Sequence, residues 1–163
     1  MPEWYHGYLQ QVKGTNVLKA LSEQQKTVTL VLRKIPGNKQ NFRYTKGKWT
    51  IKEVLQHLID SERVFAYRAL SFSRNDNSAL PGFDENSWAL NTNPAKRNWK
   101  EMVDEFVAVR TSTIFLFKSF SKKQLQLHGV ANNNPVYAEG IGFIIAGHAS
   151  HHIEIIKERY LLD

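Results

Sequence analysis

The sequence predicts an all-α protein built as a four-helix bundle. Three observations carry this prediction: four long segments repeat apolar residues at a period near 3.6, no segment alternates convincingly as a strand would, and no internal repeat is present. The chain of 163 residues fits one domain, 1–163, that can bury a single core. Its composition, 42% hydrophobic and 23% charged, is typical of a globular rather than a disordered chain.

The first long helix is expected from Asn16, which can cap its N-terminus, to about Ile35. Pro36 and Gly37 then stop it. Before this helix, the aromatic segment 3–12 is compatible with a short helix of its own.

The second long helix is expected over residues 50–74. Thr50 and Glu53 have the spacing of a capping box, in which each side chain bonds the other residue's backbone amide. An apolar stripe then follows the helix, and His57 lies beside that stripe, at the margin of the core.

A long connection, residues 75–97, follows and includes a short helix expected at 84–88. Structureless connections of this length are uncommon and often functional, so we expect a crossover that can act as a lid. The third long helix is expected at 98–120, with a short turn at 121–125, and the Asn-rich stretch 129–135 is expected to be a loop.

The last helix, 139–160, contains the most informative motif. His148 and His152 are four residues apart and therefore lie one above the other on the same helical face. A histidine pair at this spacing also occurs without a metal, so the pair alone leaves ligands and ordinary histidines open. His57 offers a third imidazole from the second helix, and bundle cores commonly hold metals between facing helices. His151 points about 100° away from His152, to the outside or behind the ligands.

Three histidines without a fourth protein ligand are typical of a catalytic metal site with an open position. The chain has no cysteine, so imidazole and oxygen must hold the ion. We expect a divalent metal, zinc or nickel first, with iron, manganese or cobalt as alternatives. Asp60 and Glu62, near the second-helix ligand, could orient an imidazole or act as a base.

Four further residues are candidates for substrate binding. Arg63 and Tyr67 follow His57 on successive turns and could bind an anionic group, although a surface ion pair is the commoner fate of such an arginine. Phe83 and Trp88, in the long connection, could line a cleft or equally plug the end of the bundle.

The formal charge of +7 is concentrated in residues 1–52, which carry ten Lys/Arg and two Asp/Glu. These basic residues are dispersed and have no nucleic-acid-binding motif beside them, which favours a solvated basic face over a nucleic-acid surface. No apolar run is long enough to span a membrane and no secretory signal is visible, so we expect a cytoplasmic protein.

The segments Trp49–Glu62, Leu80–Glu85 and Ile144–His152 together resemble the DinB-like proteins, a superfamily that includes YfiT-type metal-dependent hydrolases. The resemblance covers essentially the whole chain. It implies a bundle with an up-down-down-up arrangement, often a homodimer, and a metal triad that maps onto His57, His148 and His152.

Related enzymes of this superfamily transfer or isomerise conjugates of thiols such as bacillithiol. The resemblance therefore implies a thiol S-transferase acting on electrophilic small molecules, with a low-molecular-weight thiol as co-substrate. The first alternative is metal-dependent hydrolysis, and the second is a non-catalytic, stress-related metal-binding protein. Fold likeness supports the site better than the substrate.

Overall fold

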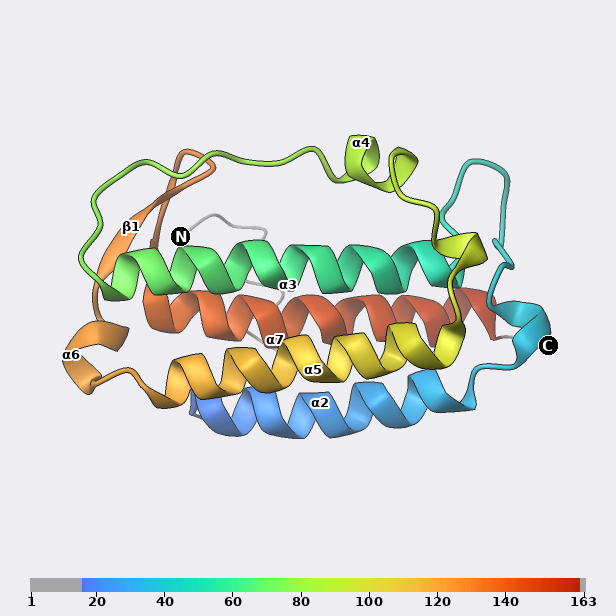
Figure 1. Cartoon of the computed structure of the whole chain (residues 1–163), viewed down its shortest axis with the longest axis horizontal. Helices are drawn as coiled ribbons and strands as arrows, with labels where there is room; N and C mark the ends of the chain where they lie inside the picture. Colours follow the sequence, from blue (N-terminus) through green and yellow to red (C-terminus); the bar gives the residue numbers. More distant parts are fainter. Residues whose placement is uncertain (1–15, 162–163) are drawn as a thin grey trace.

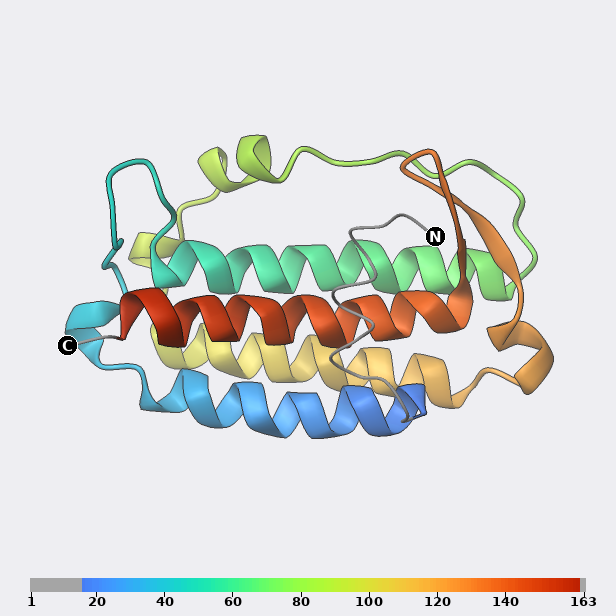
Figure 2. The ribbon, with the colours of Figure 1, turned by 180° about the vertical axis from the view of Figure 1, so that it is seen from behind.

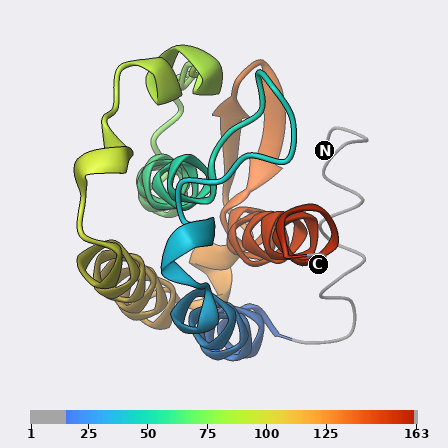
Figure 3. The ribbon, with the colours of Figure 1, turned by 90° about the vertical axis from the view of Figure 1, so that its right-hand side faces the viewer.

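The structure is a computed structural model that describes residues 16–161. Within this part of the chain, four long helices are packed side by side: α2 (Val17–Lys34), α3 (Ile51–Ser73), α5 (Trp99–Lys118) and α7 (Ala138–Ile155). Helices α2 and α3 each contact both α5 and α7, so α2 and α3 occupy opposite corners of the bundle (Figure 3). The predicted four-helix bundle is confirmed. The helix considered for residues 3–12 lies outside the described residues.

Helix direction explains the long connection. Figures 1 and 2 show α2 and α7 running one way along the bundle, and α3 and α5 running the other way. Because α3 and α5 are parallel, the chain must return along the bundle between them. This crossover contains α4 (Glu85–Leu90) and a 3-10 turn (Pro94–Lys96), and it passes along the outer side of α3.

The predicted helix starts have local causes in the structure. The Asn16 side chain accepts a hydrogen bond of 2.8 Å from the Lys19 amide, which satisfies a free donor at the start of α2. At the start of α3, the Glu53 amide donates to the Thr50 hydroxyl and the Thr50 amide donates to the Glu53 carboxylate. This is the capping box that the sequence predicts. The last helix differs slightly, since α7 ends at Ile155 and a π-helical turn (Ile156–Tyr160) completes it.

The expectation of an entirely helical chain with a loop at 129–135 is wrong. After the short helix α6 (Lys122–Leu125), strands β1 (His128–Ala131) and β2 (Asn134–Tyr137) form an antiparallel hairpin. Asn132 and Asn133 both have positive φ angles, 49° and 61°, which match the tight turn that joins twisted strands. Leu80 of the crossover pairs with Ala131, so the hairpin also anchors the start of the crossover.

The core consists of two apolar clusters separated by a polar layer. One cluster includes Leu21 and Phe117, and the other includes Leu32 and Phe106. Between the clusters, each long helix contributes a buried polar side chain to the layer: Gln24, Glu62, Arg110 and His148. Burying polar groups costs free energy unless they find partners, so this layer is the natural place to look for function. In the part of the chain that the structure describes, every helix is too short or too polar to cross a membrane.

Candidate metal centre

Three imidazoles from two helices converge at the polar layer. His57 on α3 and His148 on α7 approach each other with Nε2 atoms 3.0 Å apart, and the Nε2 atoms of His148 and His152 are 3.1 Å apart. One nitrogen of each ring lies within 4.8 Å of the other two. The spacing i, i+4 stacks His148 and His152 on α7, and the packing of α3 against α7 brings His57 to them.

The geometry of the three nitrogens fits a metal ion. For tetrahedral zinc with Zn–N bonds of about 2.05 Å, ligand nitrogens lie about 3.3 Å apart, close to the separations seen here. The rings cross at steep angles, 76° for His57 and His148 and 89° for His148 and His152, so they approach one point from different directions. The donor set, three imidazoles and no thiolate, suits zinc, nickel and other first-row divalent ions.

The electrostatics hold the imidazoles in the form that binds metals. Burial lowers the pKa of His57 to about 4 and, with smaller contributions from the neighbouring imidazoles, lowers the pKa of His152 to about 3. Burial and the other histidines also lower the pKa of His148 well below its ordinary value. All three rings are therefore neutral at pH 7 and need not lose a proton to bind a cation.

Two residues that the sequence reasoning did not select support His57. The Ser61 hydroxyl lies 3.3 Å from His57 Nδ1, one turn further along α3, and this contact leaves Nε2 directed at the other two histidines. The Trp49 ring packs against the His57 ring with centroids 4.9 Å apart. The i, i+4 spacing of His57 and Ser61 is a signal that could have identified the hydroxyl.

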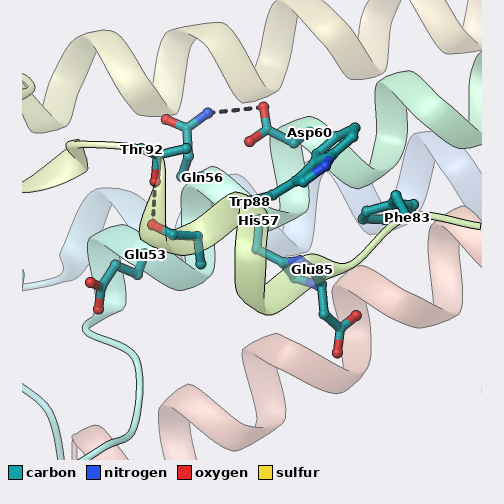
Figure 4. A pocket seen from close by; sticks show the side chains of 9 residues that line it. Glu53, Gln56, His57, Asp60, Phe83, Glu85, Trp88 and Thr92 are labelled. Carbon is teal, nitrogen blue, oxygen red and sulfur yellow. Dashed lines mark hydrogen bonds between the residues drawn. The ribbon is translucent and has the colours of Figure 1, made fainter.

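The triad opens to the surface on two sides. On the His57 side lies a narrow pocket of about 10 Å³ beneath α4, and its walls include Asp60, Phe83 and Trp88 (Figure 4). On the His152 side lies a wider cleft of about 230 Å³. The two sides differ in size and in the residues that line them.

Asp60 lies at the wall of the narrow pocket, which His57 also lines. Gln56 donates a hydrogen bond of 3.0 Å to its carboxylate (Figure 4). Arg97 donates to the Gln56 carbonyl oxygen, which fixes the amide. Burial raises the pKa of Asp60 above its ordinary value, although Gln56 and Arg63 oppose this shift. A carboxylate with a raised pKa beside a metal pocket is suited to accept a proton.

Glu62 lies inside the bundle and pairs with a buried arginine. Its carboxylate forms a two-pronged ion pair with Arg110, at 2.7 and 2.8 Å, inside the bundle. Arg110 is fully buried and also donates to Gln24, so Glu62 balances a buried charge. Arg110 also helps to lower the pKa of His148, so this ion pair lies near the triad, and a supporting role of Glu62 there stays a prediction.

The substrate-binding candidates separate into two pairs. Arg63 and Tyr67 line neither the narrow pocket nor the wider cleft. Arg63 is half-exposed and forms a surface ion pair with Glu105 at 2.6 Å, and Tyr67 is exposed. Phe83 and Trp88, in contrast, line the narrow pocket with ring centroids 4.7 Å apart. The crossover thus lines the candidate site and does not plug the end of the bundle.

A helical bundle with three neutral imidazoles at one point defines a class of protein with a candidate metal centre in its core. The chain belongs to the DinB superfamily, whose family model matches residues 20–156. Its fold is similar to that of YfiT from Bacillus subtilis, a probable metal-dependent hydrolase with an unusual four-helix bundle topology. The TM-score is 0.78 at 17% identity, over 87% of this chain and 82% of that chain. No curated protein is significantly similar to the chain.

Proposed function

We propose that the chain is a metal-dependent enzyme in which His57, His148 and His152 hold a divalent ion that activates a nucleophile. The observation that carries the proposal is the convergence of three neutral imidazole nitrogens within 4.8 Å of one another. An ion bound there would act as a Lewis acid and lower the pKa of a water or thiol group brought to it. Three protein ligands leave a position free for that group.

The residues around the triad have separate tasks in this proposal. Ser61 orients His57 through Nδ1, and Trp49 shields that ring from water. Asp60 accepts the proton that the nucleophile releases, and Gln56 holds the carboxylate in place. Phe83 and Trp88 narrow the opening above Asp60, which limits the access of bulk water.

The leading form of the proposal is thiol S-transfer to an electrophilic small molecule. The chain has no cysteine, so a nucleophilic sulfur has to arrive with a co-substrate such as bacillithiol. The cleft beside His152 and the groove that continues it, about 230 and 360 Å³, together have the volume of a site for an organic molecule.

Hydrolysis is the second form, and the narrow pocket favours it. That pocket places Asp60 beside His57 in a space suited to a small nucleophile such as water. The similar fold of YfiT, itself a probable metal-dependent hydrolase, supports this form.

The experiment compares turnover of a chromogenic electrophile, 1-chloro-2,4-dinitrobenzene, and of a chromogenic ester by zinc- and nickel-loaded protein, with and without bacillithiol. Thiol-dependent conversion of the electrophile supports S-transfer, and thiol-independent cleavage of the ester supports hydrolysis. Asp60→Asn should lower kcat for the hydrolytic reaction about 100-fold if Asp60 is the base. A metal-loaded protein that turns over neither compound would instead support the non-catalytic metal-binding alternative.

A further inference from the structure

The wider opening of the triad is the one that can admit an organic ligand. The narrow pocket beside His57 has a volume of about 10 Å³, whereas the cleft beside His152 has about 230 Å³ and continues into a groove of about 360 Å³. Sites for small organic molecules usually have about 300 to 1,000 Å³, which the cleft reaches together with the groove. Gly47, Lys48, Trp49 and Asn86 line both the cleft and the groove, so the two form one continuous surface.

The walls of this cleft are flat, aromatic and held in place. The Tyr160 hydroxyl donates a hydrogen bond of 2.7 Å to the Trp49 carbonyl oxygen, which ties the π-helical turn after α7 to the loop before α3. The Tyr44 ring packs edge-on against the Tyr160 ring with centroids 4.8 Å apart. Rings that are fixed before a ligand arrives lose little entropy on binding, so the cleft suits an apolar or aromatic body.

The charge at the mouth of the cleft is positive. Lys48 lines both the cleft and the groove and is exposed, and no carboxylate of the described residues forms an ion pair with its ammonium group. The nearest acid in the groove, Glu53, already accepts from the Thr50 amide at 2.6 Å and faces Arg43 at 3.9 Å. Lys48 is therefore a cation available to a ligand.

The carboxylates on the opposite side do not form a matching site for a positively charged ligand. Figure 4 shows Asp60 turned toward Gln56, Glu85 pointing the opposite way, and Glu53 pointing in a third direction. Because these groups diverge, they cannot surround one ammonium group. The observations therefore favour an anionic ligand in the cleft over a cationic one in the pocket.

We propose that the organic ligand of this site enters beside His152, stacks its body on Trp49, and places an anionic group at Lys48. The inference deepens the proposed function and rests on it, since the reactive end of the ligand then lies at the histidine triad. Substrates or co-substrates should thus be small molecules with an apolar middle and a carboxylate or similar anion at the far end.

The test uses cobalt(II)-loaded protein and three aromatic thiols that differ only at the far end. They are 4-(mercaptomethyl)benzoate, 4-(mercaptomethyl)benzyl alcohol and 4-(mercaptomethyl)benzylamine. When the thiol of any of these compounds binds cobalt(II), the absorption spectrum of the cobalt changes, which reports binding. The rigid ring keeps the group at the other end off the metal. The proposal predicts that the carboxylate binds about fivefold more tightly than the alcohol at low salt, and the amine more weakly than either. Added salt should reduce the preference.

Lys48→Gln should abolish the preference for the carboxylate without changing the affinity for the alcohol. Lys46→Gln is the matched control, because Lys46 is an exposed lysine of the same loop that lines none of these pockets, and it should keep the preference. Equal affinities for the three thiols, or a preference that survives in Lys48→Gln, would overturn the inference. A protein that shows no cobalt absorption before any thiol is added would overturn the proposed function itself.

Discussion

The metal-free protein should lose stability as the pH falls below about 7, because its core histidines resist protonation. Burial lowers the pKa of His57 from 6.5 to about 4 and that of His152 to about 3. In the unfolded chain both rings take up protons near pH 6.5, whereas in the folded chain they remain neutral until the pH is far lower. Below pH 6.5 the unfolded state therefore binds more protons, so acid favours unfolding.

The magnitude follows from the shift. For His57 the difference of 2.5 units between 6.5 and about 4 corresponds to about 3 kcal/mol. This contribution to the free energy of unfolding is complete above pH 7 and is lost progressively between about pH 6.5 and 4. His152 changes stability in the same direction. Most carboxylates titrate below pH 5, so the interval from pH 7 to 5 reports mainly on histidines.

Urea unfolding of chelator-treated protein at several pH values from 7 to 5 measures this loss. His57→Gln should flatten the dependence on pH, whereas His128→Gln should not, because His128 is exposed on strand β1. A free energy of unfolding that stays constant from pH 7 to 5 in the unmodified protein would contradict the neutral state of the core histidines. The same dependence on pH in His57→Gln would contradict it too.

Two further predictions concern the residues around the triad. Glu62→Gln should lower the free energy of unfolding by about 3–5 kcal/mol, because it leaves the Arg110 charge buried without its partner. The control Asp104→Asn, which breaks an exposed ion pair, should lower it by less than about 1 kcal/mol. Equal losses for the two variants in urea unfolding would contradict the burial of the Arg110 charge. Ser61→Ala should weaken zinc binding about tenfold in a competition titration, whereas Ser71→Ala, on the same helix away from the triad, should leave the affinity unchanged.

Local signals in the sequence predicted most of the scaffold and the triad. The capping box of Thr50 and Glu53 marks the start of α3 in both sequence and structure. The spacing of His148 and His152 defines one face of α7, and the position of His57 beside the apolar stripe directs it to the same layer. The homodimer and the cytoplasmic location remain predictions.

What the sequence did not predict depends on tertiary contacts. Glu62 follows His57 by five residues, which turns it about 140° around α3 from His57, toward Arg110. Its partner lies 48 residues further along the chain, beyond the reach of any local pattern. The hairpin was missed because its strands have only four residues each and its turn relies on Asn132 and Asn133 with positive φ, a conformation that composition alone does not specify.

The most direct test of the account is the metal content of the purified protein after loading with zinc and gel filtration. The unmodified chain and the His128→Ala control should each retain about one ion per chain, and His148→Ala should retain almost none, because it removes the imidazole that lies between the other two. Far-ultraviolet circular dichroism of the variant confirms that the bundle is intact. Full retention of zinc by a folded His148→Ala protein would contradict the three-histidine site.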